Sequence, residues 1–146
     1  RDVTGVQTCA LPICMSMMPV VRGKGGEGKT SLVASWMAEL ALKEINAAGG
    51  VNGRTVEVET FNFQGVGKAN IVGEGGIVKV VAEKGGPVLG VHMVGPHVTD
   101  LISEAMLITN WEAAPAEVAA LIHPHPTLSE ALGEAHLALA GKPLHN

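Results

Sequence analysis

The stretch Ile77-Val-Lys-Val-Val-Ala-Glu-Lys-Gly-Gly-Pro-Val-Leu-Gly-Val-His-Met-Val94 decides the fold of this 146-residue chain. Two valine-rich runs, a composition typical of strands, flank the turn-forming residues 83–87. We expect a β-hairpin whose strands cover residues 77–82 and 88–94. Upstream, the run Arg54–Phe61 alternates apolar and polar residues, as a half-buried strand does, and supplies a third antiparallel strand.

Helical patterns follow these strands. Apolar residues recur at helical spacing in three segments, which are Thr99–Trp111, Pro115–Ile122 and Thr127–Ala140. Strands followed by a run of helices predict an α+β fold rather than a βαβ repeat. We expect a small antiparallel sheet of three to five strands packed with about three helices. Residues 65–76, which are spaced by glycines, are expected to form a loop or an irregular strand.

The N-terminal third differs from the rest in pattern and in charge. Ser31–Ala48 predicts one helix, ended by Gly49 and Gly50, which we expect to be loosely attached to the sheet domain. Residues 57–146 carry four Lys, no Arg and ten Asp and Glu, an acidic balance that disfavours nucleic acid as a partner. No apolar run reaches the roughly 18–20 residues that span a bilayer, so we expect no membrane partner.

The uneven charge indicates segments of different origin, and we divide the chain after residues 14 and 56. Residues 1–14 resemble the translation of a sequencing-library adapter, so we leave them out of the expected fold. Leu40–Glu57 resembles the first helix-to-strand step of periplasmic branched-chain amino-acid binding proteins. Residues 15–56 are therefore expected to form a helix and a turn, joined to a separate domain at 57–146. We therefore expect the chain to be encoded by a chimeric open reading frame.

Residues 23–30, Gly-Lys-Gly-Gly-Glu-Gly-Lys-Thr, fit the phosphate-binding pattern G-x4-G-K-[ST]. In such a loop Gly23 and Gly28 let backbone N–H groups converge on phosphates, and Lys29 neutralises charge while Thr30 holds Mg²⁺. The pattern should follow a buried strand, yet only two valines precede it. A P-loop protein that binds ATP is therefore kept as an alternative function.

The strongest constellation is His123-Pro-His-Pro-Thr-Leu-Ser-Glu130, at the entrance to the last predicted helix. A histidine there can act as an acid or base near neutral pH, and the prolines fix the backbone that presents it. Glu130 can accept a hydrogen bond from the imidazole and so set its tautomer. Thr127 and Glu130 also form a capping box, which is a purely structural interpretation. The remaining histidines are expected in packing or at the surface: His92, His97, His136 and His145.

A metal pair at His123 and His125 is a further interpretation of the same motif. No cysteine lies nearby, and no carboxylate stands at a matching helical spacing. We predict no metal site.

From Phe61 to Asn146 the chain resembles the C-terminal dimerisation domain of dihydrolipoyl dehydrogenases, which are FAD-dependent pyridine nucleotide–disulphide oxidoreductases. The landmarks stand in family order at residues 76–81, 88–95, 101–105, 123–130 and 134–145. The resemblance implies that His125 is the catalytic acid–base, that Glu130 orients it, and that the pair serves a redox disulphide of the other subunit in a homodimer. It also implies FAD and NAD in the parent family, lipoyl domains of 2-oxo acid dehydrogenase complexes as partners, and a cytoplasmic location.

The chain departs from that family in its first third. No FAD or NAD domain is recognisable, and the spacer between Cys9 and Cys14 lacks the Gly and Asn of the family's redox pair. We expect the fragment to bind no cofactor and to be inactive alone, supplying the dimer interface and the acid–base pair. A small non-catalytic interaction domain, in which His125 and Glu130 only shape a helix start, remains the other alternative.

Overall fold

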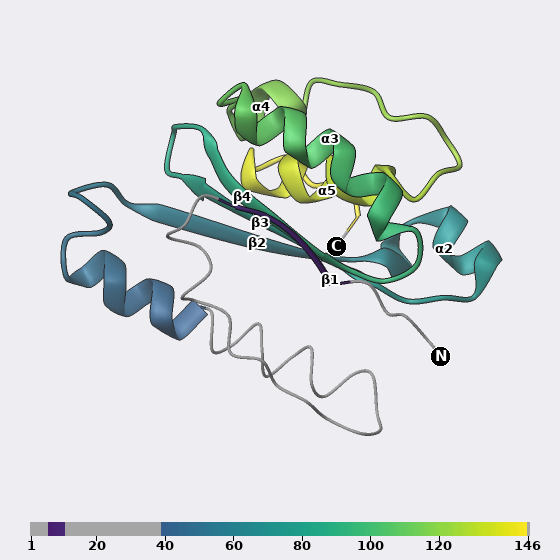
Figure 1. The fold of residues 1–146 in the computed structure, drawn as a ribbon, viewed down its shortest axis with the longest axis horizontal. Helices are drawn as coiled ribbons and strands as arrows, with labels where there is room; N and C mark the ends of the chain where they lie inside the picture. The colour runs from purple at the N-terminus through teal and green to yellow at the C-terminus, as the bar shows by residue number, and fades with distance from the viewer. Residues whose placement is uncertain (1–5, 11–38, 146) are drawn as a thin grey trace.

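A computed structural model describes the backbone of residues 6–10 and the whole of residues 39–145. Its centre is one antiparallel sheet in the order β1–β4–β3–β2. The strands are β1 (Val6–Ala10), β2 (Val56–Asn62), β3 (Ile77–Glu83) and β4 (Val88–Val94). The helices α3 (Val98–Asn110), α4 (Pro115–Val118) and α5 (Glu130–Leu139) cover one face of it (Figure 1). The predicted α+β fold is confirmed.

The hairpin of β3 and β4 sets the register of the sheet. Val80 lies opposite Val91 and Val78 opposite Met93, so these four side chains share the face that the helices cover. All four are almost fully buried, each contributing about 1.5–3 kcal/mol of hydrophobic stabilisation. The connection closes where the Glu83 N–H donates to the Pro87 carbonyl at 3.0 Å.

The opposite face of the sheet carries a much smaller apolar cluster. Val56 and Val81 are buried there, and Leu42 from the helical residues 39–47 packs against them. Asn46 also exchanges two hydrogen bonds with the backbone of Val56, at 2.7 and 3.0 Å. Figure 1 shows this helical segment on the far side of the sheet from α3 and α5. Its described part is thus held by few contacts, as expected of a loosely attached helix.

The first strand was not expected. Residues 6–10 belong to the adapter-like stretch, yet they form β1 and pair with β4 from Val6–Val94 to Ala10–Gly90. Without this strand, one edge of β4 would expose a row of unpaired N–H and C=O groups.

The glycine-spaced segment was expected to be a loop or an irregular strand, and that prediction is wrong. It contains the helix α2 (Gly67–Val72), which follows the 3-10 helix η2 (Phe63–Gly65). The side chain of Asn62 caps η2 by accepting the Gln64 N–H at 2.9 Å. Gly73 ends α2 in the left-handed conformation, at φ 76°. Helices of 3 and 6 residues are too short for apolar residues at helical spacing to predict them.

Part of the predicted N-terminal organisation lies outside the described residues. This applies to the phosphate-binding pattern with Gly23, Gly28, Lys29 and Thr30, to Cys14, and to the first turns of the predicted helix. Within the described residues, no helix has the length and apolar character needed to cross a membrane.

Candidate active site

His125 lies in the loop of residues 119–129, which connects α4 to α5. The peptide bond between His125 and Pro126 is cis. Thr127 closes the loop, because its hydroxyl donates to the Pro124 carbonyl and accepts from the Ser129 hydroxyl, the latter at 2.7 Å. These two hydrogen bonds therefore stabilise the part of the loop that leads into α5.

His125 and Glu130 are in direct contact, as the sequence predicted. The His125 Nδ1 lies 2.8 Å from the Glu130 Oε1, while the Glu130 Oε2 accepts the Thr127 N–H at 2.8 Å. One half of the capping box is thus formed, by Glu130 Oε2 and the Thr127 N–H, while the Thr127 hydroxyl bonds Pro124 and Ser129 instead of the Glu130 N–H. The other oxygen of Glu130 meets the imidazole. The His125 side chain is 74% exposed and that of Glu130 22%. No described residue hydrogen-bonds to His125 Nε2.

The surroundings keep Glu130 ionised. Partial burial raises the pKa of Glu130, but the Thr127 N–H, the hydrogen bond from His125 and the nearby charges of His125 and His123 outweigh it. The pKa of Glu130 therefore lies below its ordinary value. An ionised carboxylate only accepts hydrogen bonds, so it favours the His125 tautomer that carries its proton on Nδ1.

A second His–Glu pair lies beside the first and was not expected from the sequence. The His123 Nε2 is 2.7 Å from the Oε1 of Glu104, which belongs to α3. The His123 side chain is only 10% exposed. The hydrogen bond that His123 donates to Glu104 is the largest cause that raises the pKa of His123. The two residues are 19 positions apart, and no spacing rule links them.

The remaining histidines match their expected structural roles. His92 is buried in β4, and His136 is fully buried in α5, where its Nδ1 meets the Leu132 carbonyl at 2.7 Å. Burial is the main cause that lowers the pKa of both. His97 is exposed at the start of α3, and His145 contacts Glu134 at 3.0 Å.

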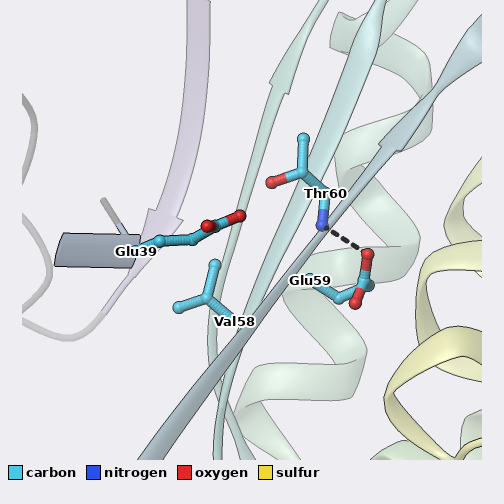
Figure 2. Close-up of a pocket in the computed structure, with 4 residues that line it drawn as sticks. All are labelled: Glu39, Val58, Glu59 and Thr60. Atoms are coloured by element: carbon cyan, nitrogen blue, oxygen red, sulfur yellow. Dashed lines mark hydrogen bonds between the residues drawn. The ribbon is translucent and has the colours of Figure 1, made fainter. Parts of the chain in front are cut away.

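Two hollows of the described surface lie away from His125. Figure 2 shows one where the helical residues 39–47 approach β2, lined by Glu39, Val58, Glu59 and Thr60. Its one marked hydrogen bond runs from the Thr60 N–H to the Glu59 carboxylate at 3.2 Å. A wider hollow of about 600 Å³ lies between the end of β2 and the C-terminal tail. Neither is lined by His125 or Glu130.

The described residues do not fit FAD or NAD. Dinucleotides bind where a parallel strand leads through a glycine-rich turn into a helix, whereas every strand pair described here is antiparallel. In the same part of the chain, no three His, Cys, Asp or Glu side chains converge to hold a metal ion.

Comparison with known proteins shows which family and which proteins this chain is similar to. A profile of the pyridine nucleotide-disulphide oxidoreductase dimerisation domain matches residues 40–136, which includes the segment upstream of the boundary expected at residue 57. Dihydrolipoyl dehydrogenase of Bacillus subtilis is 55% identical over 110 residues, covering 74% of this chain and 23% of that protein. Mitochondrial dihydrolipoyl dehydrogenase 1 of Arabidopsis thaliana is 39% identical over 95 residues, covering 64% of this chain and 19% of that protein.

A solved structure agrees in fold. The crystal structure of LpdA from Mycobacterium tuberculosis superposes with a TM-score of 0.58 at 21% identity, covering 66% of this chain and 21% of that one. The chain thus spans about a fifth of the length of the relatives it matches. It belongs to the pyridine nucleotide-disulphide oxidoreductase dimerisation domain family.

Proposed function

We propose that this chain is a piece of a dihydrolipoyl dehydrogenase that supplies the dimer interface and, in His125 and Glu130, an acid–base pair. Family membership and the named relatives support the parent enzyme. The observation that carries the catalytic assignment is the 2.8 Å contact between the His125 Nδ1 and the Glu130 Oε1, beside an exposed imidazole.

The pair can activate a thiol. With the Nδ1 proton held by Glu130, the Nε2 lone pair of His125 is the ring's basic site. A dihydrolipoyl thiol, whose ordinary pKa is near 8.5, gives its proton to Nε2, and the imidazolium stabilises the thiolate. The thiolate then attacks one sulphur of a disulphide in the partner subunit, forming a mixed disulphide and releasing the other sulphur as a thiolate.

The exposed position of His125 requires a partner to complete the site. Large apolar side chains are exposed on α3, at its C-cap and in the loop that leads to His123: Met106, Leu107, Trp111, Leu121 and Ile122. A second subunit that covers this surface would shield the apolar groups and bring its disulphide to His125. We therefore propose a homodimer in the cytoplasm that takes its substrate from the lipoyl domains of 2-oxo acid dehydrogenase complexes.

The fragment itself is proposed to be inactive, because the described residues offer neither a dinucleotide site nor a redox cysteine pair. A purified chain that reduces NAD⁺ with dihydrolipoamide would contradict this. No observation on the described residues favours the ATP-binding alternative.

An exchange enzyme tests the catalytic assignment. Residues 40–146 would replace the matching segment of the Bacillus subtilis dehydrogenase, and dihydrolipoamide-dependent reduction of NAD⁺ would be measured. We expect His125→Gln to lower kcat by about 10²–10⁴-fold, since it removes the base. Glu130→Gln should lower kcat by about 10²-fold, because an amide N–H facing Nδ1 favours the other tautomer.

The matched control is His97→Asn, which changes an exposed histidine whose Nδ1 lies 3.8 Å from an Asp100 carboxylate oxygen. It should retain the activity of the exchange enzyme. If His125→Gln retains that activity too, the pair only shapes the start of α5, and the non-catalytic interpretation stands.

A further inference from the structure

Two histidines of one short loop face different surroundings. His125 is 74% exposed, whereas His123, two residues earlier, is 10% exposed. The His123 ring rests directly on the backbone of α5, since a Cβ added to Gly133 would lie 2.5 Å from its Nδ1. Its Nε2 meets Glu104 of α3 at 2.7 Å. The ring of His123 therefore links α3, α5 and the loop that carries His125.

The two His–Glu pairs also interact through their charges. The groups that face His123 are Glu104 from α3, Glu130 and His136 from α5, and the backbone of Leu121 on its own loop. The hydrogen bond to Glu104 favours the charged form of His123, and this positive charge in turn favours ionised Glu130. Charge-assisted hydrogen bonds of this length are about twice as strong as neutral ones, and little solvent reaches this ring.

We propose that Glu104 and His123 are positioning residues for the reaction of His125. Their ion pair fastens the loop between α4 and α5 to α3 and holds a positive charge beside Glu130. Glu130 then stays ionised and aligned on the Nδ1 of His125. This inference rests on the proposed function of His125, and neither Glu104 nor His123 touches the thiol in it.

The first test follows titration in the full 146-residue chain by NMR of imidazole nitrogens and carboxyl carbons. Glu104→Gln keeps an acceptor for the His123 Nε2–H but removes the negative charge. We expect the pKa of His123 to fall and that of Glu130 to rise. Glu104→Ala removes the acceptor as well and should also lower the fraction of His125 that carries its proton on Nδ1. Asp100→Asn, an exposed change on the same helix, is the control and should leave all three readings unchanged.

The second test measures the same variants in the exchange enzyme. Glu104→Gln should lower kcat by about 10-fold with an unchanged KM for dihydrolipoamide, and Glu104→Ala should lower it further. The acid limb of the kcat profile should move, because the charge of His123 beside the catalytic pair is then lost at a lower pH. If the folded Glu104→Ala enzyme has an unchanged kcat–pH profile, the proposal is overturned. Lower stability with that unchanged profile would show a merely structural role for Glu104.

The two tests separate this inference from the proposed function. If His125→Gln leaves activity intact, the proposed function fails, and with it the role of the second pair in the reaction. If His125→Gln abolishes activity while Glu104→Gln changes neither the Glu130 titration nor the pH profile, only the positioning inference is overturned.

Discussion

A single carboxylate, that of Glu130, makes both contacts on which the candidate site depends. Sequence reasoning found this residue because both of its partners are local: His125 is five positions away and Thr127 three. Helix-start chemistry links such positions directly. Glu104 was not found, because its contact with His123 exists only where α3 and the loop meet in space. Local pairs can thus be predicted from spacing, and pairs made by tertiary packing cannot.

Buried His136 should make stability depend on pH. Burial lowers the pKa of His136 in the folded chain, so below about pH 6.5 the unfolded chain binds a proton that the folded chain does not. The free energy of unfolding should therefore fall as pH falls from 7.5 to 5. His136→Leu should flatten this decline in urea titrations, even though it loses the contact with the Leu132 carbonyl.

The comparison for that measurement is His97→Asn, which removes an exposed imidazole instead of a buried one. Buried His92, whose pKa is also lowered, should account for part of the decline that remains. An identical slope in His136→Leu and the parent chain would show that His136 is not involved.

At the scale of elements, the choice of residue in α5 depends on the His123 ring that packs against this helix. Gly133 stands in the middle of a helix, where alanine is ordinarily favoured by about 1 kcal/mol. Here an alanine Cβ would overlap the His123 ring, and such overpacking typically costs about 1–3 kcal/mol. We expect Gly133→Ala to lower the free energy of unfolding by about 1 kcal/mol net and to displace His123 from Glu104. Urea unfolding and the His123 NMR titration would measure both effects.

Gly75→Ala is the matched control, because an added Cβ there meets nothing within 4 Å. It should leave both readings close to those of the parent chain. A Gly133→Ala chain that is as stable as the parent, with an unchanged His123 titration, would mean that the ring has room to move.

The elements themselves were predicted unevenly. The hairpin strands were predicted to within one residue of their observed ends, because valine-rich runs and a glycine–proline turn agree with each other. Two helices are shorter than expected. Helix α4 ends at Val118 and α5 begins at Glu130, so residues 119–129 form a loop. Pro124 and Pro126 have no N–H to donate, and each disfavours a helical backbone at the histidine before it. Apolar spacing alone does not show such ends.

At the scale of the whole molecule, the helix-covered sheet was predictable and its fourth strand was not. Pattern identified β2, β3 and β4, since each has apolar residues for the core. The strand β1 is added by backbone pairing with β4 across a long gap in sequence, and pairing of this kind leaves little trace in composition.

The exposed apolar loop should govern assembly. Leu121 is 61% exposed and Ile122 98%, and both precede the candidate site. We expect Leu121→Ser with Ile122→Ser to weaken the dimer of the exchange enzyme by at least about 10-fold in Kd, which corresponds to about 1.4 kcal/mol. Analytical ultracentrifugation would measure this. The tail residue Leu144, 73% exposed, gives the control Leu144→Ser, which should dimerise like the parent. Equal Kd values for both variants would place the interface elsewhere.

The opposite exposure of His123 and His125 has a consequence for loop length. Only Pro124 separates an imidazole enclosed by α3 and α5 from one presented to solvent. An insertion or deletion of one residue here would shift the two rings relative to their carboxylates and leave at least one ring unmatched. Length polymorphism in this connection should therefore be far rarer among functional variants than in the hairpin turn at residues 84–86.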